Sequence, residues 1–67
     1  QPLVPSGPVS IGRHCFIGSR AVIMGGVTLG DHCIVGANSV VTRSFPAGSV
    51  VAGAPARLIR MQPGMGN

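Results

Sequence analysis

The chain has 67 residues, which is enough for one small domain with a thin core but short for a self-sufficient enzyme. It is 45% hydrophobic and contains 11 Gly and 6 Pro, which excludes both a charged disordered tail and a helical bundle. Its five Arg and single acid, Asp31, give a net charge of +4, but with only 3% aromatic residues it lacks the stacking surface of a nucleic-acid binder.

We therefore expect no nucleic-acid partner. We also expect no membrane partner, because no apolar run approaches the length that spans a bilayer. No export signal opens the sequence, so we expect a cytoplasmic protein in which Cys15 and Cys33 are reduced thiols.

Large aliphatic residues recur every six positions along the middle of the chain. They are Ile11, Ile17, Ile23, Leu29, Val35 and Val41. A small or β-branched residue follows each of the first five by four positions. A period of six fits neither a helix nor a simple strand alternation, but it fits short strands joined by tight turns around a shared interior. We predict almost no helix, and burial of all six aliphatic residues in the assembled protein.

Three such hexads would close one triangular coil and give a longer period of 18. The pairs that show it are Gly12/Gly30, His14/His32, Cys15/Cys33, Gly18/Gly36 and Val22/Val40. We expect full coils over residues 11–28 and 29–46 and a partial coil from residue 4, with Val51 at a small inward position. Residues 1–67 then form a single domain, with coils over 4–51 and a C-terminal segment and tail over 52–67. We place the glycines that follow most aliphatic positions at the corners, where a positive φ can be required.

A narrower match lies in the runs VSIG (9–12), FIGS (16–19), GVTLGD (26–31) and VGANSVVTR (35–43), with the ending GAPARLIR (53–60). These runs resemble the C-terminal half of the hexapeptide-repeat O-acetyltransferases that act on sugars and antibiotics, such as the maltose and galactoside acetyltransferases. The resemblance covers residues 8–60, and the ending makes it specific. It departs at Phe16, where the family usually has Trp, and at Arg43 and Ser44, where Lys and Asp are common.

The resemblance implies an all-β fold, a left-handed parallel β-helix of about three 18-residue coils. It also implies acetyl-CoA as co-substrate, bound in a groove between neighbouring prisms, and a small-molecule hydroxyl acceptor. For the pantetheine arm of the cofactor, the resemblance implies packing against Phe16 and hydrogen bonds between its amides and backbone groups of Ser19 and Ala37. For the nucleotide end, it implies Thr42 and Arg43 beside the adenine and phosphates, and Arg57 and Arg60 on the phosphates. For Arg57 and Arg60, the alternative interpretation is that they only solvate a terminal segment.

No residue is assigned a catalytic role. The family's general base is a His upstream of the matched region, and nothing here aligns with it. We interpret His14 and His32 as solvent-facing turn residues stacked one coil apart. A zinc site that joins them to Cys15 and Cys33 is disfavoured, because the thiols sit at inward positions and the imidazoles at outward ones. We expect no metal, and both cysteines as small core fillers.

Two functions stay open from the sequence. One is the cofactor-binding portion of an acetyl-CoA-dependent O-acetyltransferase, and the other is a catalytically inactive trimeric β-helix that serves as a structural or assembly module. A thin core and exposed strand edges favour association, so we expect a homotrimer through the flat faces, with end-to-end stacking at the N-terminal coil as a further option.

Overall fold

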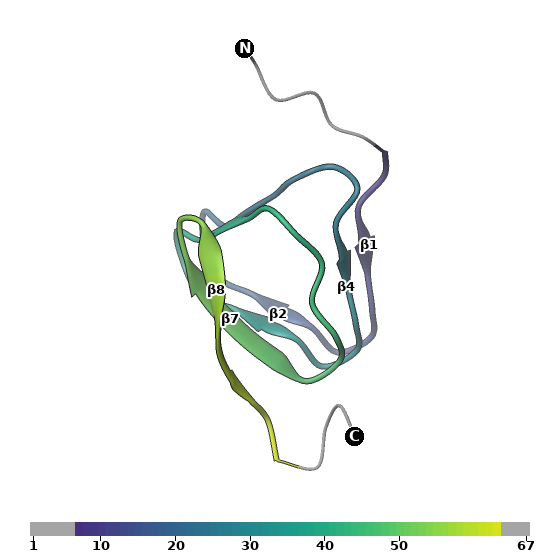
Figure 1. The fold of residues 1–67 in the computed structure, drawn as a ribbon, viewed down its shortest axis with the longest axis vertical. Helices are drawn as coiled ribbons and strands as arrows, with labels where there is room; N and C mark the ends of the chain where they lie inside the picture. Colours follow the sequence, from purple (N-terminus) through teal and green to yellow (C-terminus); the bar gives the residue numbers. More distant parts are fainter. Residues whose placement is uncertain (1–6, 64–67) are drawn as a thin grey trace.

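The computed structural model describes residues 7–63, and within that range it contains strands and turns but no helix (Figure 1). None of the described segments is therefore a helix that could cross a membrane. The strands are β1 (Ser10–Ile11), β2 (Phe16–Ile17), β3 (Val22–Ile23), β4 (Thr28–Leu29), β5 (Ile34–Val35), β6 (Val40–Val41), β7 (Ser49–Gly53) and β8 (Ala56–Met61).

The strands stack coil upon coil as a left-handed parallel β-helix, which confirms the predicted fold. One face holds β1 and β4, the second holds β2, β5, β7 and β8, and the third holds β3 and β6. In the first coil the register pairs residues 18 apart on every face: Ile11 with Leu29, Ile17 with Val35 and Ile23 with Val41. Only β8 runs antiparallel, and it closes the chain as a hairpin on β7.

The second coil is two residues shorter than predicted. Leu29 is bridged to Phe45, and Val35 pairs with Val51, so both partners are 16 residues apart. The predicted coil boundary at residue 46 is therefore wrong. Val51 also takes the large aliphatic position beneath Val35, not the small one.

The shortening occurs at the corner after β6, where only residues 42–44 separate Val41 from Phe45. The corner closes early because Ser44 Oγ accepts a hydrogen bond from the Thr28 N–H at 2.8 Å. The Phe45 N–H then donates to the Thr28 carbonyl at 3.1 Å. Phe45 therefore enters the interior beneath Leu29, and Ser49, not Val51, becomes the small inward residue.

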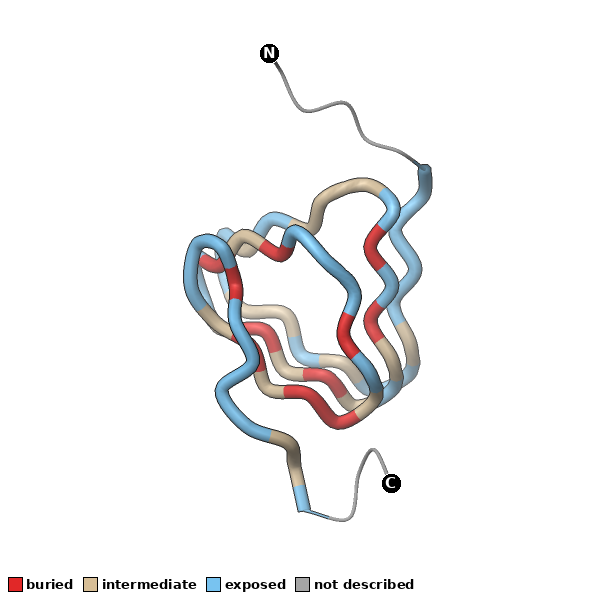
Figure 2. The backbone as a smooth tube through the Cα atoms, in the orientation of Figure 1, coloured by how far each residue is buried: buried red, intermediate tan, exposed pale blue. Residues whose placement is uncertain are grey.

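Burial rises along the helix from its N-terminal end (Figure 2). Leu29, Val35 and Val41 in the second coil are fully buried, Ile17 and Ile23 are half-buried, and Ile11 is 46% exposed. All six point to one interior. Ile11 is exposed in the single chain because no described residue covers the first coil, so burial of all six in the assembled protein stays a prediction. At the opposite end, buried Phe45 and Ala56 close the core.

The predicted role of the corner glycines is wrong. Positive φ recurs every six residues, but two positions later, in the turns: His14, Arg20, Gly26, His32 and Asn38 have φ between 57° and 83°. Gly12, Gly18 and Gly30 are needed for close stacking instead. A Cβ on Gly18 would lie 2.5 Å from the Ala37 nitrogen. A Cβ on Gly12 or on Gly30 would lie 2.4 Å from the nearest atom of the next coil.

Replacing Gly18 by Ala should lower the free energy of unfolding by about 1–3 kcal/mol, because the added methyl meets backbone that cannot move aside cheaply. Gly36→Ala is the matched control, since its Cβ would lie 3.1 Å from the Ala52 methyl rather than against backbone. We expect a smaller loss there. Urea titration of both variants measures the difference, and equal losses would contradict the stacking explanation.

The cysteines point inward and are free thiols. The Cys15 thiol donates to the Gly30 carbonyl and the Cys33 thiol to the Pro46 carbonyl, each at 3.2 Å. Ser49 continues the same inward stack and donates its hydroxyl to the same Pro46 carbonyl at 2.7 Å. Cys33 is fully buried, and this burial raises the pKa of its thiol above the ordinary value.

The raised pKa predicts a loss of stability at alkaline pH. Since the fold favours the protonated Cys33, its contribution is complete below the pKa of the unfolded thiol, about 8.5, and is lost as pH rises through the higher folded pKa. The sequence has no Lys and no Tyr, so neither of those side chains contributes to a change in stability in this alkaline range. Cys33→Ser should flatten the alkaline fall in the urea midpoint, and half-buried Cys15→Ser should retain it. An unchanged fall in Cys33→Ser would contradict this assignment.

Candidate functional site

An open pocket of about 260 Å³ lies where the corner after β6 meets the tip of the β7–β8 hairpin. Its lining residues are Thr42, Arg43, Pro55, Ala56 and Arg57. Two segments well separated in the sequence thus bring together three of the seven predicted cofactor-binding residues. Pro55 and Ala56 were not predicted, although they lie inside the GAPARLIR ending that carried Arg57.

The hairpin joins the helix through the pairing of β7 with β5, and a buried hydroxyl ties down its tip. Ser39 is fully buried, and its Oγ accepts a hydrogen bond from the Gly53 N–H at 3.1 Å. Gly53 has a φ of 105°, which glycine adopts readily, and buried Ala56 begins the returning strand β8. These contacts set the position of Arg57 relative to the corner that carries Thr42 and Arg43.

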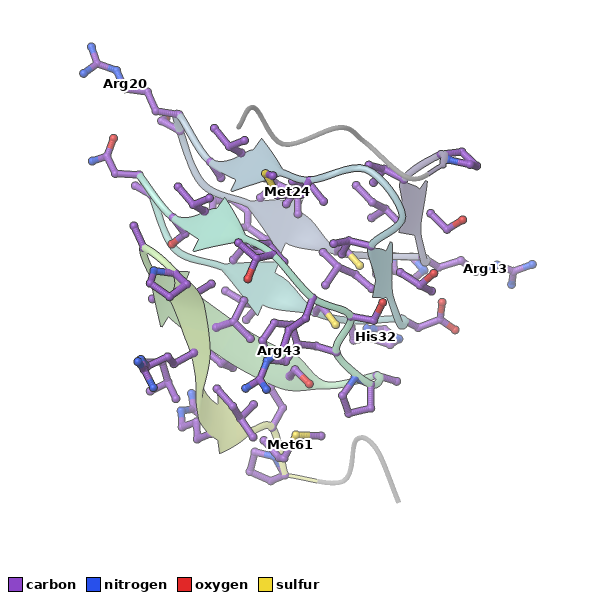
Figure 3. All side chains as sticks on the ribbon, turned by 45° about the horizontal axis from the view of Figure 1, so that its top comes forward. Arg13, Arg20, Met24, His32, Arg43 and Met61 are labelled. Carbon is purple, nitrogen blue, oxygen red and sulfur yellow. The ribbon has the colours of Figure 1, made fainter. Side chains whose placement is uncertain are left out.

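The pocket is positively charged. Arg43 and Arg57 both line it and are exposed to solvent. The only acid of the chain, Asp31, lies on another corner, where its carboxylate accepts a hydrogen bond from the Arg13 backbone N–H at 2.8 Å. Guanidinium groups without a carboxylate partner suit phosphate, because their planar fork of N–H donors matches its oxygens. In Figure 3, Arg13 and Arg20 project into solvent away from Arg43.

Phe16 and Arg60 lie outside the pocket but share one outward row of the second face. Phe16 is in register with Ile34, Ile34 with Val50, and Val50 with Arg60 on β8. Phe16 is 66% exposed. With about 4.8 Å between neighbouring strands, the two ends of this row are about 14 Å apart.

Ser19 and Ala37 occupy a third place, the corner between the second and third faces. The Asn38 N–H donates to the Ser19 carbonyl at 2.9 Å, so that carbonyl already has a partner. Among the backbone hydrogen bonds of residues 7–63, neither the Ser19 N–H nor the Ala37 N–H has an acceptor. The Ser19 N–H is therefore a backbone donor that no backbone acceptor of residues 7–63 occupies.

His14 and His32 stack as predicted, with ring centroids 5.2 Å apart and planes within 16°. They sit on the corner between the first and second faces, whereas the pocket joins the hairpin to the corner after β6. His14 is exposed and His32 half-buried, and the Gln62 side-chain amide donates to the His32 carbonyl. Across the described residues, no three His, Cys, Asp or Glu side chains form a group that could hold a metal ion.

Comparison with known proteins identifies proteins that are similar to this chain in sequence and in structure. A repeat family described as the hexapeptide repeat of succinyl-transferase matches residues 8–43. No curated protein matches the sequence. A maltose O-acetyltransferase from Clostridium difficile 630 superposes with a TM-score of 0.80 at 42% identity, over 82% of this chain and 29% of that one.

Two further solved structures contain the cofactor. A galactoside acetyltransferase in complex with coenzyme A has a TM-score of 0.80 and 48% identity, over 84% of this chain and 28% of that one. A hexapeptide-repeat acetyltransferase from Vibrio cholerae O1 biovar eltor, complexed with acetyl coenzyme A, has a TM-score of 0.80 and 42% identity, over 82% and 30%. The chain thus spans about 30% of the length of these similar structures.

Ser39→Ala should loosen the hairpin that carries Arg57. It leaves the Gly53 N–H without its acceptor, and we expect exchange of that amide with solvent to accelerate by roughly tenfold or more. Amide exchange followed by NMR measures this residue directly. Ser44→Ala is the control: it removes the acceptor of the Thr28 N–H on the other wall and should accelerate Thr28 but not Gly53. An unchanged Gly53 rate in Ser39→Ala would contradict the anchoring role.

Proposed function

This chain belongs to the hexapeptide-repeat family of acyltransferases, and we propose that it forms the cofactor-binding portion of an acetyl-CoA-dependent O-acetyltransferase. The observation that supports this most is the pocket in which Arg43 and Arg57 meet without an acidic partner. The nucleotide end of CoA is polyanionic, and its phosphates would satisfy both guanidinium groups.

The remaining predicted residues extend the proposed site away from the pocket. The unbonded N–H groups of Ser19 and Ala37 are available to the carbonyls of the pantetheine arm. The exposed ring of Phe16 offers that arm an apolar surface, and Arg60 adds positive charge at the far end of the same row.

Transfer to a hydroxyl needs a base that takes the acceptor's proton. Histidine is the residue type that most often serves as such a base, and the two histidines of the sequence, His14 and His32, lie on a different corner from the pocket. We therefore propose that this chain alone binds the cofactor and does not transfer acetyl groups. The acceptor would be a small molecule with a hydroxyl group.

We further propose a homotrimer in which each cofactor groove forms between neighbouring prisms. The outward row of Phe16, Ile34 and Val50 is apolar, and Val22 adds a half-exposed side chain on the next face. Burying these surfaces between copies would compensate for the thin core of one chain. The same apolar faces also favour the second candidate function, an inactive trimeric assembly module.

Replacing Arg57 and Arg60 together by Ala should abolish measurable binding of CoA. Each charge-assisted bond from Arg to phosphate contributes roughly 1.5–3 kcal/mol where water is excluded, so losing two weakens binding by about a hundredfold or more. Isothermal calorimetry with CoA measures this loss. Arg13→Ala is the control for the single variant Arg57→Ala, because it removes the same charge from a corner that carries none of the proposed binding residues.

Light scattering and an acetyl-transfer assay on the same samples separate the candidate functions. We expect a trimer of about three times the 6.7 kDa chain mass that binds CoA without turnover. A trimer that binds no CoA would favour the assembly module, and a stable monomer at micromolar concentration would refute the trimer. Robust turnover that survives His14→Ala and His32→Ala would show that the base is another group.

A further inference from the structure

Arg43 does not extend freely into solvent. Its guanidinium carbon lies 5.3 Å from the centroid of the Phe45 ring, within the range of a cation–π contact. No carboxylate of the described chain is placed to hold this side chain, because Asp31 is bonded to the Arg13 backbone on another corner. The aromatic ring is thus the partner that the structure gives to this guanidinium.

Phe45 itself is held rigidly. It is only 7% exposed, its backbone is bridged to Leu29, and its carbonyl accepts from the Gly30 N–H at 3.1 Å. The two-residue shortening of the second coil brings it into the interior directly after the corner that carries Arg43. An anchored ring therefore lies two residues from a flexible cation that lines the pocket.

The geometry of a guanidinium makes this contact compatible with anion binding. Stacking on an aromatic ring uses the flat face of the group, while its N–H donors lie in the plane and point outward from its edge. A stacked Arg43 loses rotamer freedom before the ligand arrives but keeps its donors available. Fixing a side chain in its bound arrangement reduces the entropy that binding must overcome.

We propose that Phe45 is a positioning residue that holds Arg43 beside Arg57 as a preformed clamp for the phosphate groups of the ligand. The inference rests on the proposed function, since it names what orients one of the phosphate-binding residues. Phe45 does not touch the ligand in this proposal. It acts through the negative electrostatic potential of its ring face, which attracts the Arg43 guanidinium.

The test weakens the negative electrostatic potential on the face of the Phe45 ring while nearly preserving the shape of the side chain. A 67-residue chain is accessible to chemical synthesis, so 3,4,5-trifluorophenylalanine can be placed at position 45 alone. Fluorination weakens the negative face of the ring and nearly preserves its volume. We expect CoA binding by calorimetry to weaken about threefold, the size of a partly exposed cation–π contact. In an Arg43→Ala background, the same fluorinated ring should cause no further loss.

A second measurement does not depend on CoA. The Arg43 Hε resonance should be shifted upfield by the Phe45 ring current and should return toward the position of the exposed Arg13 and Arg20 resonances in Phe45→Leu. If the intact chain binds no CoA but shows this shift, the proposed function fails while the contact stands. If CoA binds and depends on Arg43, yet the fluorinated chain binds equally well, positioning by Phe45 is refuted and the proposed function is not.

Discussion

Close contact between successive coils is the constraint on which the rest of the structure depends. The regular coils consist of two-residue strands joined by tight turns, so a single coil has few hydrogen bonds within itself. Its backbone groups are therefore bonded to the neighbouring coils. Gly12, Gly18 and Gly30 allow this approach because a methyl group at any of them would collide with the next coil. The turns then adopt positive φ at regular spacing, even at His14, Arg20, His32 and Asn38, because stacking fixes the path of the chain.

The pocket arises from the two places where this regular stacking stops. The corner after β6 closes two residues early, and the chain then reverses at the end of β7 into an antiparallel strand. The first irregularity positions Thr42 and Arg43, and the second brings Arg57 to meet them. The regular coils form the wall of the prism, and the residues that line the pocket come from the two irregular segments.

The six-residue aliphatic period was sufficient to predict short strands around a shared interior and the burial of Leu29, Val35 and Val41, and the family resemblance added the left-handed β-helix. The sequence was insufficient for the second coil, since the period of 18 ended that coil at residue 46 and nothing local marked Phe45 as the next inward residue. The role predicted for the glycines was wrong because a glycine can be required either for a positive φ or for close approach of another segment. The sequence does not distinguish the two roles, whereas the distance from each glycine to the next coil does. The resemblance assigned both Arg43 and Arg57 to the phosphate end of the ligand, but their meeting in one pocket and the contact of Arg43 with Phe45 became visible only in the structure.

The exposed first coil has a consequence for how proteins of this shape vary in length. The carbonyls of Leu29, Val35 and Val41 accept bonds from the coil before, and no described residue bonds the corresponding groups of Ile11, Ile17 and Ile23. Additional hexapeptide coils can join there in the same register, each lengthening the prism by about 4.8 Å. The pocket lies at the other end, so the prism can change in length without a change in the residues that line the pocket.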